Sequence, residues 1–205
     1  HNIYKKKIRQ YVTDFWACST TAGQFFFDEE IMRSDRYQII GNAIDLNRYR
    51  FRPELRETTR KSYGISDAFV IGHIARMNPE KNQIFLLNVF SEILKLVPNS
   101  VLLFAGQGKY RSRLEEKAKE LGITDKVKFL GEQQDVRALY MAMDVFLLPS
   151  LFEGLPVTLV EAQAAGLTCY TSEEGVPKEA RISSLLHYIS LRESAADWAA
   201  AVCKA

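Results

Sequence analysis

The chain has few cysteines, no long apolar run and no excess of either charge. Its three cysteines among 205 residues form no Cys-x-x-Cys pair and no histidine-spaced pattern, so a disulfide framework or zinc site is not expected, and we predict reduced thiols in a cytoplasmic protein. No apolar run reaches about 18 residues and no signal peptide is visible. Lys and Arg number 27 against 25 Asp and Glu, a balance that requires neither nucleic acid nor an anionic membrane as partner.

Repeats and low-complexity segments are also lacking, and what is present is a regular alternation from about residue 67 onward. Apolar, β-branched runs predict strands at 68–76, 100–108, 126–132, 144–150 and 167–173. Helical periodicity predicts helices at 82–97, 109–122, 135–143 and 154–166. Short loops between strands and helices are typical of a parallel sheet, so we predict an α/β, Rossmann-like doubly wound domain over 46–190.

The two ends of the chain do not follow this alternation. We interpret residues 1–45 as the remnant of a preceding domain with its linker, and 37–51 as a short strand followed by a loop. The basic segment 5–9 is interpreted as a solvated helix face. We expect a truncated C-terminal helix over 191–205. Because the chain begins at His1, we also expect it to be a piece of a longer protein.

Two glutamates stand out in the segment 150–166, SLFEGLPVTLVEAQAAG. Glu161 interrupts an apolar helix, where an unpartnered carboxylate is costly, so some group should meet it. The helix opens at Gly154 and Pro156, and its free amides form an anion site toward which the Glu161 side chain leans. A phosphate on these amides, with hydroxyls near Glu161 and Glu153, describes a nucleotide-sugar. The alternative is that Glu161 pairs with a core arginine and Glu153 is solvated.

Two cations follow the first predicted strand of the domain. Arg76 and Lys81 flank an Asn-Pro turn, and two cations five positions apart can clamp a diphosphate. An ordinary surface turn would have the same composition. His73, within the strand itself, is interpreted as a core or pocket-wall histidine, with contact to a donor sugar as the alternative.

A Gly-x-Gly turn, Gly106 and Gly108, follows the second strand. It invites comparison with a dinucleotide fingerprint, in which Glu132 would be the ribose-binding acid. The third glycine of that fingerprint is missing, because Arg111 stands in its place. A tight turn between strand and helix is therefore the favoured interpretation.

In combination these segments resemble the C-terminal, donor-binding half of retaining glycosyltransferases with the B-type, two-Rossmann architecture, family four (glycosyl transferases group 1). The resemblance spans about 36–180. FEGLPVTLVEAQAAG is similar to the Glu-x7-Glu signature, GHIARMNPEKN to the Arg…Lys segment, VLLFAGQG to the Gly-x-Gly turn and IIGNAIDLNRY to the interdomain linker. Ala43 stands where the family prefers Gly, so the linker there must avoid positive φ.

The resemblance implies a role for each matched residue. Arg76 and Lys81 would bind the donor diphosphate and stabilise its charge as the sugar leaves, and Glu153 would hold a hydroxyl of the transferred sugar. Glu161 would bind the ribose hydroxyls. The other expected donor contacts are Gly106, Gly108, Leu130, Gly131, Gly154, Leu155, Pro156, Val157 and Thr158.

The resemblance also implies an activity. A sugar would pass with retention from a UDP- or GDP-linked donor to a glycan, lipid-linked or small acceptor, in surface or capsular polysaccharide assembly. No metal or other cofactor is expected, because cations and a helix end neutralise the phosphates and no Asp-x-Asp occurs. With the acceptor domain largely missing, we expect donor binding with little transfer, and peripheral membrane association only of the full-length enzyme. The alternatives are a nicotinamide-dependent oxidoreductase domain using Glu132 and a non-catalytic Rossmann-like module.

Overall fold

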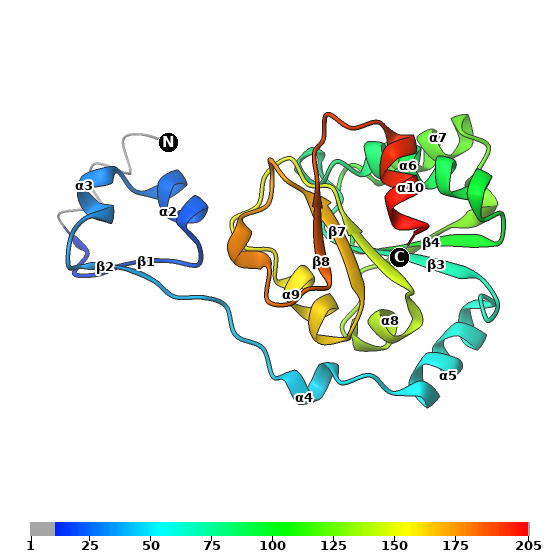
Figure 1. Cartoon of the computed structure of the whole chain (residues 1–205), viewed down its shortest axis with the longest axis horizontal. Helices are drawn as coiled ribbons and strands as arrows, with labels where there is room; N and C mark the ends of the chain where they lie inside the picture. Colours follow the sequence, from blue (N-terminus) through cyan, green and yellow to red (C-terminus); the bar gives the residue numbers. More distant parts are fainter. Residues whose placement is uncertain (1–10, 205) are drawn as a thin grey trace.

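The computed structural model describes residues 11–204, which form two separate sheets joined by an extended linker (Figure 1). The smaller sheet pairs two parallel strands, β1 (Phe15–Ala17) and β2 (Tyr37–Ile39), with α2 (Thr20–Phe26) and α3 (Glu29–Met32) between them. The short strand expected in 37–51 is therefore confirmed. The loop expected after it is wrong in part, because α4 (Leu46–Tyr49) forms there behind an Asp45 cap.

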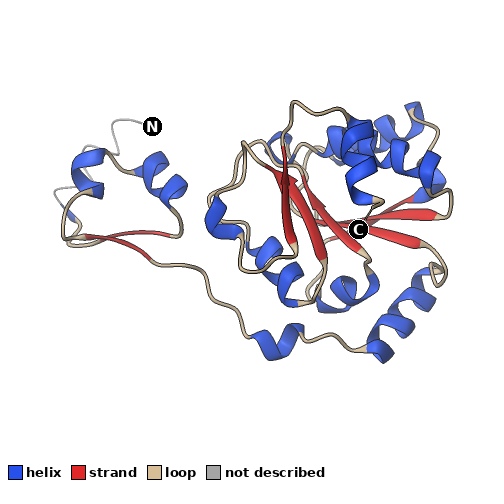
Figure 2. Cartoon of the chain, viewed as in Figure 1, coloured by secondary structure: helices blue, strands red, loops and turns tan. Residues whose placement is uncertain are grey.

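The larger sheet contains six parallel strands in the order β5–β4–β3–β6–β7–β8 (Figure 2). Their bounds are β3 (Phe69–Ile74), β4 (Ser100–Ala105), β5 (Val127–Gly131), β6 (Val145–Leu148), β7 (Thr168–Ser172) and β8 (Leu186–Ile189). Strands covered on both faces form near-continuous apolar runs, which is the pattern that the sequence shows. The prediction of a doubly wound parallel sheet is confirmed.

Helices cover both faces of this sheet and define two cores. One face carries α5 (Pro53–Tyr63), α8 (Arg137–Ala142) and α9 (Val157–Ala164). The other face carries α6 (Gln83–Leu96), α7 (Arg111–Glu120) and α10 (Ala195–Val202). Short 3-10 turns complete the domain at η1 (Pro79–Lys81), η2 (Thr124–Lys126) and η3 (Lys178–Ala180).

The C-terminal part adds one strand that the sequence pattern did not predict. β8 contains only four residues, LHYI, and an exposed His187 breaks its apolar run, so periodicity gave no signal. The helix expected in 191–205 is α10, which begins with a capping box between Ser194 and Asp197. Its Trp198 is fully buried against Phe85 of α6. The basic segment 5–9 lies outside the described residues.

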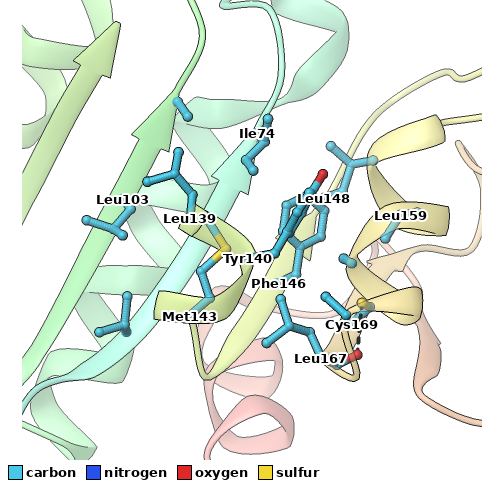
Figure 3. Packing of buried hydrophobic residues seen from close by; sticks show 14 of the residues in the cluster. Ile74, Leu103, Leu139, Tyr140, Met143, Phe146, Leu148, Leu159, Leu167 and Cys169 are labelled. Carbon is cyan, nitrogen blue, oxygen red and sulfur yellow. Dashed lines mark hydrogen bonds between the residues drawn. The ribbon is translucent and has the colours of Figure 1, made fainter. Parts of the chain in front are cut away.

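The core beside α9 places a tyrosine under the signature helix. Figure 3 shows Tyr140 of α8 among Phe146, Leu148 and Leu159. Tyr140 is fully buried, so its hydroxyl needs a hydrogen-bond partner inside the domain. Within residues 11–204, no helix is both long and apolar enough to cross a membrane.

Candidate donor-binding site

The predicted site residues meet at the carboxyl edge of the sheet, where the loops after β3, β4, β5 and β6 converge. Two cavities open there, of about 390 and 740 Å3, and Arg76 lines both. The smaller cavity is lined by Ile74, Ala75, Arg76, Asn78, Lys81, Glu153, Leu155, Pro156, Val157 and Thr158. The larger is lined by Arg76, Gln107, Gly108, Lys109, Arg111, Gly131 and Glu132. Nine of the thirteen predicted site residues line these two cavities, which together are called the groove below. The predicted residues that line neither cavity are Gly106, Leu130, Gly154 and Glu161.

The two cations predicted to bind the diphosphate differ in their partners. Arg76 is exposed, and no carboxylate among the described residues pairs with its guanidinium. Lys81 forms an ion pair with Glu153, with 2.6 Å between Nζ and Oε1. The next residue, Asn82, has φ of 54°, a left-handed conformation that Asn tolerates better than most residues. Asn82 ends η1 and precedes α6, so its conformation helps to fix the position of Lys81 beside it. An Asn directly after the lysine was the one feature of the sequence that could have indicated this turn.

Glu153 is a buried carboxylate with two donors, which contradicts its interpretation as merely solvated. Only 8% of the residue is exposed. Its Oε1 accepts from Lys81 Nζ at 2.6 Å and from Ser150 Oγ at 2.7 Å. No described residue donates to Oε2, and the side chain lines the smaller cavity. One carboxylate oxygen is therefore fixed while the other can accept from a ligand hydroxyl.

Glu161 is met by two tyrosines and not by the core arginine that was the alternative. Tyr49 Oη donates to Oε1 at 2.5 Å, and Tyr140 Oη donates to Oε2 at 2.8 Å. Burial, followed by the hydrogen bond to Glu161, raises the pKa of Tyr49 to about 12. Burial also raises the pKa of Tyr140 well above its usual value. Both phenols therefore stay protonated as donors. Sequence reasoning missed them, because nothing in periodicity links Tyr49 to a helix 112 residues away.

The start of α9 opens on the smaller cavity. The helix begins at Val157, because Pro156 adopts a φ of −75° and ψ of 103° at the N-cap, and no side chain caps it. The Leu159 amide donates to the Pro156 carbonyl at 3.1 Å, whereas the amides of Val157 and Thr158 have no acceptor among the described residues. These two amides are available to an anion, with the helix dipole in support. Gly154 does not have positive φ, so the tight turn expected of it needs no glycine conformation. Its carbonyl instead accepts from the Ser19 hydroxyl of the smaller sheet.

The Gly-x-Gly turn is a close backbone contact with the loop that carries Arg76. A Cβ on Gly106 would lie 2.1 Å from the Ala75 carbonyl oxygen, and one on Gly108 would lie 2.1 Å from that of Met77. The Met77 amide donates to the Gln107 carbonyl at 2.9 Å. Both glycines are therefore required by the packing of two loops, which supports the tight-turn interpretation over the dinucleotide fingerprint.

The wall toward β5 contains the residues expected near the base. Gly131 has φ of 69°, and its carbonyl accepts from the Gly106 amide at 2.7 Å, while Leu130 is partly buried in the adjoining core. Glu132 is exposed and accepts from Gln107 Nε2 at 2.5 Å. Across residues 11–204, no cluster of three or more His, Cys, Asp or Glu side chains is arranged to hold a metal ion.

His73 is a satisfied core histidine that supports the Arg76 loop from below. It is fully buried, and its Nδ1 lies 2.8 Å from the Leu147 carbonyl, so Nδ1 carries the proton. Nε2 then accepts from Gln83 Nε2 at 3.1 Å, and the same amide donates to the Arg76 carbonyl. Burial lowers the pKa of His73 to about 4. The interpretation as a core residue is confirmed.

Comparison with known proteins identifies the family. The model of the family described as Glycosyl transferases group 1 matches residues 56–204, well over half of the chain. The chain belongs to this family. The nicotinamide-dependent alternative finds no support in the match.

Two curated relatives and one solved structure illustrate the likeness. The putative glycosyltransferase EpsF of Bacillus subtilis (strain 168) is 33% identical over 99% of this chain and 53% of its own length. The UDP-Gal:alpha-D-GlcNAc-diphosphoundecaprenol alpha-1,3-galactosyltransferase of Escherichia coli is 29% identical over 71% of this chain and 40% of its own. HepE of Anabaena, solved in complex with UDP and glucose, superposes with a TM-score of 0.87 at 22% identity, covering 99% of this chain and 56% of that one.

These similarities establish the fold and show how much of its relatives' length the chain covers. The structural match shows that the six-stranded domain has the fold of the C-terminal half of B-type, two-domain glycosyltransferases. The chain spans about half the length of the curated relatives that it matches. The predicted family and fold class are therefore confirmed.

Proposed function

We propose that this chain is the donor-binding part of a retaining glycosyltransferase that transfers a hexose or similar sugar from a nucleoside diphosphate. One observation carries the proposal: Arg76, which has no ion-pair partner within residues 11–204, lines the same cavity as the Lys81–Glu153 pair and the uncapped start of α9. Cations and free amides suit a diphosphate, and a carboxylate with one free oxygen suits a sugar hydroxyl.

The chemistry follows from where the charges lie. As the bond from the sugar to the diphosphate breaks, negative charge grows on the leaving phosphate. Arg76 and the α9 amides stabilise that charge, and Lys81 contributes its remaining donors while keeping its bond to Glu153. Glu153 holds the sugar through Oε2, and Glu161 accepts from the ribose hydroxyls. These groups neutralise the phosphates without a metal ion.

The relatives support the substrate class. The Escherichia coli relative is named for a UDP-linked galactose and a diphosphoundecaprenol acceptor, and the Anabaena structure contains UDP and glucose. We extend this to a UDP- or GDP-linked donor and a glycan or lipid-linked acceptor in surface or capsular polysaccharide synthesis. The enzyme would work in the cytoplasm, with peripheral contact to the inner face of the membrane.

The chain by itself would bind donor but transfer sugar poorly. In the family that the sequence resembles, a histidine on the acceptor half often assists catalysis, and this chain covers about half of its relatives. A longer protein containing this chain together with an acceptor half is expected to transfer sugar much faster. Equal transfer rates for the two would contradict this part of the proposal.

A thermal-shift panel with UDP, GDP, ADP and NAD tests donor binding. A nucleotide at about 100 times its Kd adds about 2.7 kcal/mol to the free energy of unfolding, which raises Tm by about 5–10 °C in a chain of this size. Arg76→Gln is expected to weaken binding of the preferred nucleoside diphosphate at least about tenfold. Lys81 is a poorer probe, because its loss leaves the buried Glu153 unpaired.

The matched control is Arg192→Gln, because Arg192 is an exposed arginine in the loop after β8, at the far edge of the sheet. This variant should respond to the nucleotide as the parent chain does. A shift with NAD alone would restore the oxidoreductase alternative, and no shift with any nucleotide would contradict donor binding by this chain.

A further inference from the structure

The linker contributes a side chain to the site region through Tyr49. Most residues of the segment 41–50 are exposed, but Tyr49, the last residue of α4, is partly buried against the core beneath α9. Its ring lies 6.1 Å from the ring of Tyr140, between centroids. A short and otherwise exposed helix is thereby attached to the domain at the signature glutamate.

Each of the two tyrosines binds a different oxygen of the Glu161 carboxylate. Tyr49 donates to Oε1 and Tyr140 to Oε2, one hydrogen bond on each oxygen. A carboxylate accepts at about four lone-pair positions, two on each oxygen. One position on each oxygen therefore stays open. Two adjacent acceptors in a fixed plane match the two neighbouring hydroxyls of a ribose, which present two donors side by side.

We propose that Tyr49 is a positioning residue for the donor ribose: its hydrogen bond fixes the Glu161 carboxylate so that both open acceptor positions face the 2′- and 3′-hydroxyls. The inference rests on the proposed function, because it assumes that Glu161 binds the ribose of a nucleoside diphosphate. It adds a residue from the linker to a site otherwise built from the sheet edge. Tyr140 holds one oxygen from the core, and Tyr49 sets the rotation of the carboxylate by holding the other.

A purely structural role for Tyr49 predicts a different result. If the hydroxyl only attached the linker, its removal would lower the stability of the chain but affect all nucleotides equally. If it positions Glu161, its removal weakens binding most for nucleotides that have the hydroxyl to be held. The informative quantity is therefore the ratio of the Kd of a 2′-deoxynucleoside diphosphate to the Kd of its ribose counterpart.

The experiment measures this ratio by isothermal titration calorimetry on the 205-residue chain. The nucleotide is whichever of UDP, GDP and ADP binds best, together with its 2′-deoxy form. A hydrogen bond to a charged group gives an expected ratio of about tenfold or more in the parent chain. Tyr49→Phe keeps the ring and its packing, and it should reduce the ratio to about threefold or less, mainly by weakening the ribose form.

Two variants complete the test. Tyr170→Phe removes a tyrosine hydroxyl that donates to the Ala201 carbonyl on the other face of the sheet, and it should leave the ratio unchanged. Glu161→Gln should lower the ratio as Tyr49→Phe does, and adding Tyr49→Phe to it should change little. An unchanged ratio in Tyr49→Phe, with ribose binding intact in the parent, would overturn the inference alone. Failure of every nucleoside diphosphate to bind the parent would overturn the proposed function and the inference with it.

Discussion

At the scale of single residues, the groove balances its charges unevenly. Glu153 and Lys81 neutralise each other at 2.6 Å, and Glu161 is held by neutral phenols. Arg76, which lines both cavities, has no ion-pair partner among the described residues. An incoming diphosphate therefore meets a free guanidinium and free amides without first having to break an ion pair. This arrangement keeps the cost of binding an anion low.

His73 makes the stability of the chain depend on pH. Its pKa is lowered to about 4 in the folded protein, against about 6.5 when unfolded. Above about pH 6.5 both states are neutral at this residue, so it has no effect. Between about 6.5 and 4 only the unfolded chain takes up the proton, and the free energy of unfolding falls by about 3 kcal/mol. Urea midpoints measured across this range should show the loss.

A histidine variant separates this effect from other titrations. His73→Gln should flatten the slope above about pH 4.5. Carboxylates with a lowered pKa, such as Asp135 at about 2, lose their contribution only at more acidic pH. A slope that persists in His73→Gln would show that His73 is not its source.

At the scale of elements, the site depends on how closely two loops approach. The loop after β3 carries Arg76, and the loop after β4 carries the Gly-x-Gly turn, with backbone hydrogen bonds between them. Because the backbones of these two loops are in direct contact, there is no room for a side chain at the contact points. The position of Arg76 is thus determined by glycines in the loop that follows the neighbouring strand.

Gly108→Ala tests this loop contact. The new Cβ would lie 2.1 Å from the Met77 carbonyl oxygen, so backbone must shift, at a cost of about 1–3 kcal/mol in the free energy of unfolding. Gly41→Ala is the control, because no atom lies within 4 Å of a Cβ there and its φ is not positive. It should change stability by less than about 0.5 kcal/mol. Equal urea midpoints for the two variants would show that the loop relaxes without cost.

At the scale of the whole molecule, the two sheets differ in how much core they have. The six-stranded sheet is buried on both faces, whereas the two-stranded sheet and its helices bury only a few side chains, among them Phe15 of β1 and Ile31 of α3. Contacts between the two parts include Ser19 with Gly154 and the Thr20 amide with Glu179. The Phe25 ring also contacts the Phe152 ring, with 5.4 Å between centroids. A two-stranded sheet with so few buried side chains is marginal by itself, which predicts unequal stability of the two parts.

Hydrogen exchange at the backbone amides should reveal this inequality. Amides of β3 and β4 are expected to exchange only by near-global unfolding, and those of β1 and β2 at least about tenfold faster through local opening. Mass spectrometry of peptic fragments would measure both in one experiment. Equal protection would show that the two sheets unfold as one cooperative unit.

The strands and helices of the domain were predictable where the patterns were long. Continuous apolar runs such as 100–108 predicted buried strands, and the helical spacing of apolar residues predicted the 14-residue α6. The sequence missed β8 and α4, each of four residues, because so short a segment carries no clear period and forms only when a neighbour supplies its partners. The sequence also missed three residues that support the site: Asn82, Ser150 and Gln83. Their roles depend on contacts in the folded chain, which local patterns do not show.

The sequence by itself determined the family, the parallel sheet and the carboxyl edge of the sheet, where Arg76, Lys81 and Glu153 line one cavity. Those features follow from local periodicity and from motifs whose order along the chain is preserved. Only the tertiary structure decided which group meets each charge: Lys81 for Glu153, and two tyrosines for Glu161. Hydrogen bonds act over about 3 Å, and the fold alone brings residues such as Tyr49 and Glu161 within that distance.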